Sequence, residues 1–534
     1  MFLSNSKYFY YFIFLIILII ALTIRLPELT RRPMHTDEAV HAVKFGELLE
    51  NNYYRYDKNE YHGPTLYYFT LISAWIQSSK DITKISETTL RIVPVFFGIL
   101  LLVLLLFLKP GLSRKAVIAA GFLTAISPMM VFYSRYYIQE ILLVFFSFAV
   151  FVSGYRYIKS RHIGWVLAAG IFLGLMHATK ETCIIAIGSM LASLFLLLLF
   201  RHKNNDASQK PFINVNFRDI KHIAVLILSM LAVSAFFYSS FFTNPSGIAD
   251  SYLTFGNYFN KASNNNWHIH PWYYYLKMII FSKDLSGPVW TEVFILLLAG
   301  AGFFAVILKK GIADCNIHLL RFILFYTGFM MLVYSVIPYK TPWNMLGFFH
   351  GLIILAGVGA AALLNIISGR YLRIFFIVLL AAGSVHLVRQ SFLSNYKYYA
   401  DPSNPYVYGH TSDDIFRITD RVKELAEVHP EGNNMFIEVV CPENDYWPLP
   451  WYLRDFPNTG WWNEVNMNIP AAQLIIASPD IEPDIIKKLY EMPPPGEKNL
   501  YVPLFNSYTE LRPMVELRGY VVKELWDKYL QNKK

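Results

Sequence analysis

Long apolar runs recur along the chain up to about residue 390 and do not continue beyond it. Most of them approach the roughly 20 residues that a helix needs to cross a bilayer. The pattern predicts a helical polytopic membrane domain with about eleven spans. The expected spans cover residues 8–26, 90–108, 116–133, 140–158, 163–178, 182–200, 222–242, 290–308, 320–337, 344–367 and 373–390. The first run has no small-residue cleavage site after it, so it is predicted to be retained.

Two long loops on one side of the predicted bundle, 27–89 and 243–289, contain apolar and aromatic stretches too short to span. The first is GPTLYYFTLISAWI (63–76) and the second is WHIHPWYYYLKMII (267–280). Segments of this kind lie in the membrane interface, with Trp and Tyr at the depth of the lipid headgroups. The two loops are therefore predicted to carry interfacial helices.

The pattern changes after residue 391. MFIEVVC (435–441) and AAQLIIAS (471–478) are typical of buried strands, whereas 413–428 and 483–492 are typical of helices. Strands alternating with helices predict a small α/β domain over 391–534, next to a transmembrane domain over 1–390. The aromatic motif YWPLPWYLR (446–454) leaves two interpretations open: it stacks on sugar rings, or it packs the small domain against the bundle.

Composition supports the membrane assignment, because 55% of the residues are hydrophobic and only 16% are charged. The net charge of +9 gives no indication of nucleic-acid binding, since the basic residues gather in the short loops of one side. That side is predicted to be cytoplasmic. The protein is therefore expected in the cytoplasmic (inner) membrane with its N-terminus on the cytoplasmic side, and an odd number of spans then places the C-terminal domain outside. No pair among the three cysteines is expected to meet, so neither a disulfide nor a cysteine metal site is predicted.

An acidic pair, Asp37 and Glu38, follows the first span within the stretch RRPMHTDEAVHA (31–42). One interpretation is structural: Thr36 caps a helix, and acids in its first turn complement the helix dipole. The other is chemical: a carboxylate at the outer surface acts as a general base. A third alternative is a divalent-cation site, because the segment offers metal ligands. Its candidate ligands are His35, Asp37 and His41.

Three cations occupy short outer loops, which the distribution of charge otherwise leaves poor in basic residues. They are Arg135 in SRYYIQE, Lys180 in HATKET and Lys340 in PYKTPWN. Each alone suits an interfacial anchor. Together they indicate a site for an anionic headgroup, with a phosphate as the expected ligand.

Acids accompany these cations, and the combination suits one kind of chemistry. Glu140 and Glu181 lie beside the cations in sequence, and His62 in YHGPT lies in the first outer loop, either as a structural histidine or facing the same cavity. Breaking the bond between a sugar and a lipid phosphate leaves more negative charge on the phosphate, which fixed cations stabilise. The acceptor hydroxyl needs a base, which a carboxylate supplies.

These residues carry a family resemblance. An acidic pair after one span, followed by interfacial helices and outer loops with Arg and Lys, resembles the C-type (GT-C) membrane glycosyltransferase superfamily. Within it, the chain is similar to the branch of protein O-mannosyltransferases and lipid A aminoarabinose transferases. The motifs HTDEAVHA (35–42), YHGPTLYY (61–68), YKTPWN (339–344) and YWPLPWYLR resemble most closely a prokaryotic group named for association with flippase activity in glycosylation.

The resemblance implies an inverting transferase that moves a hexosyl or pentosyl group from a polyprenyl phosphate to a hydroxyl on the outer face. Asp37 matches the family's base and Glu38 its partner. The donor phosphate is expected to contact Arg135, Lys180 and Lys340. The substrates are expected to contact His62, Glu140 and Glu181. No cofactor is required on this view, and a divalent cation is an alternative.

The acceptor is expected to be a glycan, a lipid or a protein. Protein mannosyltransferases place a different module between late spans, so the C-terminal domain is a departure that puts a protein acceptor in question. A rival hypothesis is a flippase, or a non-catalytic component, for lipid-linked glycans. The spans hold few charged residues at depth, which disfavours a polar translocation path. A structural scaffold with a partner-binding domain is a third alternative.

Overall fold

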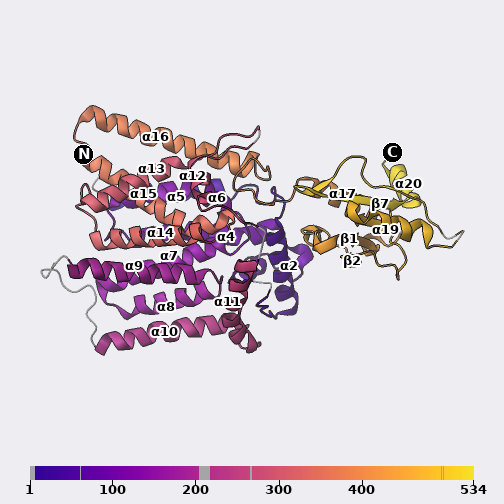
Figure 1. Ribbon diagram of the computed structural model, residues 1–534, viewed down its shortest axis with the longest axis horizontal. Coiled ribbons are helices and arrows are strands. Elements are labelled where there is room, and N and C mark those ends of the chain that lie inside the picture. Colours follow the sequence, from indigo (N-terminus) through magenta and orange to yellow (C-terminus); the bar gives the residue numbers. More distant parts are fainter. Residues whose placement is uncertain are drawn as a thin grey trace.

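The computed structural model describes residues 7–59, 62–203, 217–264, 268–284, 286–494, 496 and 498–533. Within these ranges a helical bundle is followed by a smaller domain that contains a sheet and lies beyond one end of the bundle (Figure 1). The middle of the predicted basic loop 201–221, the first residue of YHGPTLYY and the first residue of the 267–280 segment lie outside the described residues.

The bundle helices coincide with all eleven predicted spans. They are α1 (Lys7–Arg25), α4 (Glu87–Phe107), α5 (Arg114–Ile126), α6 (Pro128–Ser134), α7 (Glu140–Ser160), α8 (Ile163–His177), α9 (Cys183–Lys203), α10 (Phe217–Tyr238), α13 (Val293–Leu308), α14 (Ile317–Val336), α15 (Leu346–Ile366) and α16 (Arg370–Phe392). In the described ranges, 8 helices are long and apolar enough to cross a membrane, or 9 if α5 and α6 form one broken span. The shorter α8 and α13 are also apolar. The chain is a multi-pass membrane protein, and the number of crossings stays a prediction.

Two local features shape the bundle. The break between α5 and α6 bends the chain by 61°, where Ser127 caps the second helix and Pro128 takes its first position, which needs no N–H donor. In α15, small residues allow close packing: a Cβ at Gly359 would lie 2.0 Å from the carbonyl oxygen of Leu298 in α13. α15 is accordingly the innermost span, with 89% of its most apolar window buried.

The short helices that lie at the end of the bundle next to the small domain form what we call the domain face. They are α2 (Thr36–Asn51), α3 (Thr65–Ile76), η2 (Ile82–Lys84), α11 (Ser246–Asn264), α12 (Tyr274–Ile280) and η3 (Pro342–Met345). The predicted segment 63–76 corresponds to α3. Only the second half of the predicted segment 267–280 is helical, as α12, because Pro271 precedes it and the backbone around residue 269 pairs with Tyr339.

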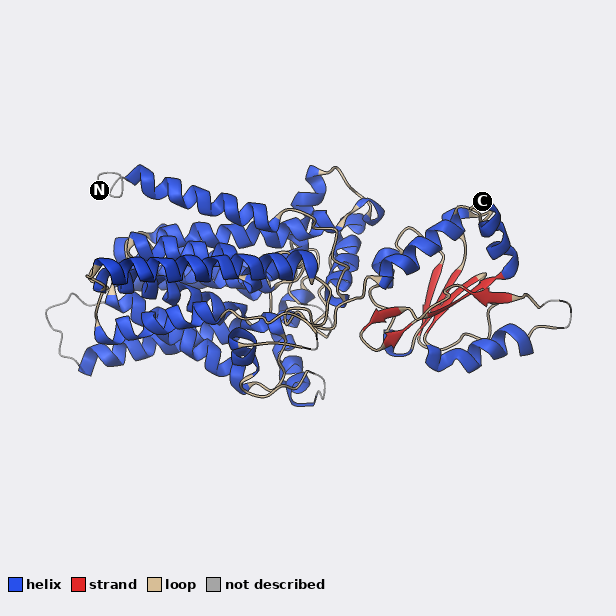
Figure 2. Cartoon of the chain, turned by 90° about the horizontal axis from the view of Figure 1, so that it is seen from above, coloured by secondary structure: helices blue, strands red, loops and turns tan. Residues whose placement is uncertain are grey.

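The small domain is α/β, as predicted. Its elements are α17 (Asp414–Ala426), η5 (Gly432–Asn434), β1 (Ile437–Val440), η6 (Pro442–Asn444), α18 (Leu449–Tyr452), β2 (Thr459–Trp462), β3 (Leu474–Ala477), η7 (Pro479–Ile481), α19 (Glu482–Ile486), η8 (Lys487–Glu491), β4 (Tyr501–Pro503), β5 (Glu510–Arg512), β6 (Val515–Glu516), β7 (Arg518–Val522) and α20 (Lys523–Asn532). The preceding η4 (Leu393–Lys397) continues α16 and contacts α6 of the bundle. The main sheet has the order β2-β1-β3-β7-β4, and helices lie on both sides of it (Figure 2). The division of the chain at residue 390 stays a prediction.

The small domain contacts the bundle through the aromatic motif at 446–454. The indole nitrogen of Trp451, which is fully buried, donates to Glu87 Oε1 at 2.8 Å. Arg454 Nη2 donates to the carbonyl oxygen of Ile85 at 3.0 Å. These contacts support the packing interpretation for the second half of the motif.

Candidate active site

Glu38 lies in a buried network of positive charge. The guanidinium of Arg91 binds both of its carboxylate oxygens, with Nε–Oε1 at 2.8 Å and Nη2–Oε2 at 2.7 Å. Arg32 Nη2 lies 3.5 Å from Oε1, and the amide of Tyr137 donates to the same oxygen at 2.8 Å. Burial acts to raise the pKa of Glu38, but Arg91 and Arg32 outweigh it and lower this pKa to about 2. Glu38 is therefore an ionised group whose oxygens are already occupied.

The same carboxylate helps to begin α2. Glu38 Oε2 accepts from the amide of His35 at 3.2 Å, and His35 Nδ1 accepts from the amide of Asp37 at 3.0 Å. The interpretation in which Thr36 caps this helix is wrong, because Thr36 is already the first helical residue and the ring of His35 supplies the acceptor. A reciprocal box of this kind satisfies orphan amides at a helix start. It also fixes the backbone at Asp37.

Asp37 differs from its neighbour in its exposure. Its side chain is 46% exposed, whereas that of Glu38 is 0% exposed. The neutral ring of His35 lies nearby, with Nδ1 3.8 Å from Asp37 Oδ2, beyond hydrogen-bond distance. The described side chains donate no hydrogen bond to this carboxylate. Asp37 is thus held by its backbone while its oxygens stay available to a ligand.

Four predicted site residues gather around His41 on α2. Burial lowers the pKa of His41 to about 3, and His62 and Lys180 act in the same direction, while Asp37 and Glu181 oppose them. Asp37 lies one helical turn before His41 on α2, the rings of His41 and His62 lie 6.0 Å apart between their centroids, and His62 contacts Glu181, which directly follows Lys180 in the chain. Three separate segments of the chain therefore meet in this region, and the roles of their residues stay predictions.

Glu181 and His62 form one side of this region. His62 Nδ1 lies 2.8 Å from Glu181 Oε2, and the hydroxyl of Tyr56 donates to Oε1 at 3.2 Å. Burial acts to raise the pKa of Glu181, but the adjacent His62 and the charge of Lys180 hold this pKa below its usual value. The pair joins the first loop of the domain face to the turn between α8 and α9.

Lys180 and Glu140 form a second buried pair. Lys180 Nζ donates to Glu140 Oε1, and both side chains are at least nine-tenths buried, at 8% and 6% exposed. The second oxygen of Glu140, Oε2, is buried without a hydrogen-bond partner in the described part of the chain. A buried carboxylate oxygen without a donor is costly, which suggests that a ligand supplies one.

A cleft opens beside this ion pair. It encloses about 360 Å³, part of it open to the surroundings, between α7, α9, α14 and the η3–α15 segment. Its lining includes Glu140, Thr182, Tyr334, Trp343 and Asn344. Charged, hydroxyl, amide and aromatic groups therefore meet at its outer end.

The cleft continues as an apolar groove along α7. A second space of about 390 Å³ shares Val144, Ser147 and Gly347 with the first. It is lined by apolar and aromatic side chains, including Phe151 and Ile354, with His350 as one of its few polar groups. From Glu140 to Phe151 the groove follows eleven residues of helix, or about 16 Å at 1.5 Å per residue.

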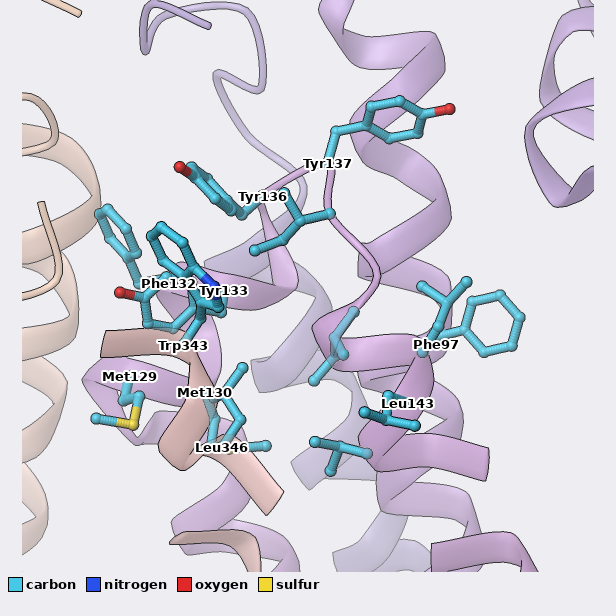
Figure 3. Close-up of a cluster of buried hydrophobic side chains, with 14 of the residues drawn as sticks. Phe97, Met129, Met130, Phe132, Tyr133, Tyr136, Tyr137, Leu143, Trp343 and Leu346 are labelled. Carbon is cyan, nitrogen blue, oxygen red and sulfur yellow. The ribbon is translucent and has the colours of Figure 1, made fainter. Parts of the chain in front are cut away.

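Close packing behind the cleft fixes its aromatic wall. Figure 3 shows Trp343 beside Tyr133, and Leu346 near Met130, so that η3 and the start of α15 lie against α6. The ring of Trp343 lies 6.2 Å from that of Tyr133 and 6.0 Å from that of Tyr136. This packing holds Trp343 in place at the cleft.

Arg135 does not join the group around His41. Its guanidinium donates to the carbonyl oxygens of Pro27 at 2.8 Å and Glu28 at 3.1 Å, and to the hydroxyl of Tyr396 at 2.5 Å. These bonds tie the loop after α1 to the segment after α16. The contacts indicate a structural role for Arg135, and its predicted role in phosphate binding has no support in this geometry.

Lys340 is also occupied by backbone groups. Its ammonium donates to the carbonyl oxygen of His270 at 3.1 Å and to that of Ile337. Partial loss of solvent lowers its pKa. The turn borders the same region, because Trp343, three residues further on, has its ring centroid 5.9 Å from that of His35. Lys340 therefore lies near the site with its donors directed at the loop.

The proposed metal ligands are engaged in other bonds. Across the described residues, no group of three or more His, Cys, Asp or Glu side chains is arranged to hold a metal ion. His35 Nε2 donates to the carbonyl oxygen of Tyr408 at 3.0 Å, and His41 Nδ1 lies 2.8 Å from the hydroxyl of Tyr67. The arrangement gives the predicted divalent-cation site no support.

Sequence reasoning missed several residues of this region. Arg91 lies in an apolar span, and its partnership with Glu38 depends on a contact 53 positions apart. Arg32 and Tyr56 lie in the first loop without any distinguishing motif. The only available signal was Arg91 itself, because an arginine near the end of a span usually has a partner.

Comparison with known proteins gives three informative structures. The transferase ArnT from Cupriavidus metallidurans bound to undecaprenyl phosphate is 13% identical, with a TM-score of 0.62 over 95% of this chain and 97% of that chain. The oligosaccharyltransferase AglB from Archaeoglobus fulgidus, in complex with an inhibitory peptide and a dolichol-phosphate, is 14% identical, with a TM-score of 0.55 over 89% and 70%. The mycobacterial arabinofuranosyltransferase AftD is 12% identical, with a TM-score of 0.51 over 97% and 40%.

At these identities the likeness shows the fold. No curated protein sequence matches the chain. Residues 15–245 match the family described as Dolichyl-phosphate-mannose-protein mannosyltransferase. This matched region holds the acidic pair and the turn that carries Lys180. The narrower resemblance to the flippase-associated group stays a prediction. The matched region, which is less than half of the chain, and the shared fold both agree with the resemblance to the GT-C glycosyltransferase superfamily.

Proposed function

We propose that the protein transfers a sugar from a polyprenyl phosphate to an acceptor hydroxyl on the extracytoplasmic side of the membrane. The observation that carries this proposal is the position of Asp37 and Lys180. Asp37 lies one helical turn from His41, whose ring neighbours that of His62, and Lys180 binds Glu140, which lines the polar end of a cleft that continues as an apolar groove. An acid, a cation and an apolar groove beside them are the parts that this reaction needs.

In this mechanism Asp37 accepts the proton of the acceptor hydroxyl. The acceptor oxygen forms a bond to the anomeric carbon of the donor sugar from the face opposite the phosphate. The bond between that carbon and the phosphate oxygen breaks, and its electron pair leaves with the polyprenyl phosphate. A single displacement inverts the anomeric configuration. A positioned general base contributes about 10²- to 10⁴-fold to such a step.

Lys180 is the donor-phosphate residue of this proposal. Its ammonium would donate hydrogen bonds to both Glu140 and the phosphate, whose negative charge increases as the sugar–phosphate bond breaks. The unpartnered Oε2 of Glu140 would then accept a hydrogen bond from a hydroxyl of the donor sugar. Glu181 contacts His62 on the other side of this region. The neighbours ArnT and AglB have been observed with undecaprenyl phosphate and dolichol-phosphate, which supports a lipid of this class.

Lys180→Gln is expected to weaken the binding of polyprenyl phosphate by about 10- to 100-fold, because a charge-assisted contact to phosphate is lost. Affinity is measured with the purified protein in lipid nanodiscs by native mass spectrometry. Lys58→Gln is the matched control, since Lys58 pairs with Asp250 at 3.0 Å on a partly exposed surface. The double variant Lys180→Gln/Glu140→Gln removes the unpaired buried charge. An unchanged affinity in both Lys180 variants would refute the phosphate assignment.

Ser147→Leu is expected to weaken the binding of a long polyprenyl phosphate about tenfold and that of a short-chain prenyl phosphate much less. Ser147 lines both parts of the groove, so a larger side chain displaces two or three methylene contacts of the lipid. Ser160→Leu at the exposed end of α7 is the control. Equal losses for both chain lengths would show that the lipid does not follow this groove.

A further inference from the structure

The edge of the sheet at which β1, β2 and β3 end has the features of a binding site. The three strands are parallel and in register, so that Val440 pairs with Trp462 on one side and with Ala477 on the other. β1 leads to β2 on one side, whereas β3 leads to β4 at the far side of the sheet, so the connections that follow β1 and β3 run in opposite directions. In open α/β sheets, ligands bind at the carboxyl ends of the strands at such a switch point.

The loops that follow these strands are bonded to one another. The amide of Cys441 donates to the carbonyl oxygen of Trp462 at 3.0 Å, and the amide of Asn444 donates to Asn463 Oδ1 at 2.9 Å. Glu443 and Asn444 both have positive φ, of 57° and 59°, which residues other than glycine adopt infrequently. The edge is thus a built surface of connected loops.

Arg512 connects this edge to the acidic motif. It binds Asp445, in the loop after β1, and its Nη1 donates to Thr36 Oγ1 at 3.1 Å. Thr36 directly precedes Asp37 in the chain. The remaining donor of the guanidinium, Nε, is buried and has no acceptor among the residues that the structure describes. The edge therefore adjoins the predicted base and offers a free donor beside it.

The side chains at this edge suit a saccharide. Tyr446 lies 5.0 Å from Trp461 and 6.4 Å from Trp447, measured between ring centroids, and all three rings are partly exposed. Asn444 and Asn463 are exposed beside them. Aromatic faces pack against the C–H faces of sugar rings, and amides exchange hydrogen bonds with hydroxyls.

The charges at the edge favour a neutral sugar over other ligands. Arg512 is balanced by Asp445, so the edge offers little net attraction to a phosphate. Its mixture of rings and amides is more polar than a surface suited to an acyl chain. A hydroxyl-bearing ring is also what a general base at Asp37 requires.

We propose that this edge binds the saccharide acceptor and presents one of its hydroxyls to Asp37. The inference rests on the proposed function and names its acceptor class: a glycan, in place of a protein or a lipid tail. Trp461 and Tyr446 supply the stacking surface, and Arg512 sets the distance between the small domain and the acidic motif.

Saturation-transfer NMR tests this site directly. The full-length protein in nanodiscs is mixed with neutral methyl glycosides and short unbranched oligosaccharides of glucose, mannose and N-acetylglucosamine. Saturation is expected to transfer to the ring protons of at least one of these sugars. Trp461→Ala is expected to weaken that binding about tenfold, whereas Trp461→Phe retains most of it. Trp75→Ala, an exposed tryptophan on α3, is expected to leave it unchanged.

The outcomes separate this inference from the proposed function. If no sugar binds, or if Trp461→Ala and Tyr446→Ala bind as well as the wild type, the acceptor site is overturned. Native mass spectrometry of the same samples reports the binding of polyprenyl phosphate independently. Variants that keep polyprenyl phosphate and lose the sugar support the acceptor site. A wild-type protein that binds the sugar through Trp461 and never cleaves a donor contradicts the proposed function alone.

Discussion

Replacing Asp37 with asparagine is expected to lower the rate of sugar transfer by about 10²- to 10⁴-fold while the affinity for polyprenyl phosphate changes little. The substitution keeps the size of the side chain and removes its basicity. The backbone at this position is fixed by His35, so α2 is expected to begin as before. The rate is measured as the appearance of free polyprenyl phosphate from a donor labelled in the sugar.

Two controls sharpen this result. Glu28→Gln removes an exposed acid that pairs with Arg31 at 2.6 Å, and it is expected to leave the rate unchanged. Asp37→Glu keeps a carboxylate at the same position, and it is expected to retain part of the activity. Wild-type transfer by Asp37→Asn would remove the general base from the mechanism.

Replacing Glu38 with glutamine is expected to destabilise the protein by about 3–5 kcal/mol. The change leaves the buried guanidinium of Arg91 without its ion-pair partner, although that group still donates to the carbonyl oxygens of Leu29 and Arg32 at 2.6 and 2.8 Å. Thermal unfolding in detergent, monitored by circular dichroism, measures the resulting decrease in melting temperature. Glu28→Gln serves again as the matched control, because its exposed ion pair is worth at most about 1 kcal/mol.

The pH dependence of stability provides a second readout for Glu38. Its pKa is lowered from 4.5 to about 2 in the folded protein. A carboxylate whose pKa is lower in the folded than in the unfolded protein contributes its full stabilisation at pH values above the unfolded-state pKa. This contribution is lost as the pH falls from about 4.5 towards 2. Glu38→Gln should lack this part of the acid sensitivity. Equal stability of variant and wild type at neutral pH would contradict the buried ion pair.

The bundle was predictable from the sequence because whether a segment can cross the membrane depends mainly on the apolar residues within that segment. Apolar length alone located the bundle helices, and the broken pair α5–α6 fell within one predicted span. In the small domain the two buried strands β1 and β3 were found. The shorter or partly exposed strands β2 and β4 to β7 were missed; β2, for example, is TGWW, a glycine followed by two tryptophans, which carries no clear alternation.

The site was only partly predictable, because its chemistry depends on contacts between distant residues. The motif identified Asp37 and Glu38 as a pair, but only the fold separates them: one is held by Arg91, and the other is exposed. Arg135 and Lys180 look alike in sequence. The first binds carbonyl oxygens near α1, and the second faces Glu140 at the cleft. No local pattern distinguishes the two.

The most direct test is the fate of the donor in sealed liposomes. The protein is reconstituted with a polyprenyl-phosphate sugar that carries a label in the sugar, and the lipid and sugar products are followed in both leaflets. The proposed function predicts that the sugar–phosphate bond breaks, that free polyprenyl phosphate accumulates, and that Asp37→Asn prevents it. Movement of the intact donor to the other leaflet, without any polyprenyl phosphate released, would contradict it and favour a flippase.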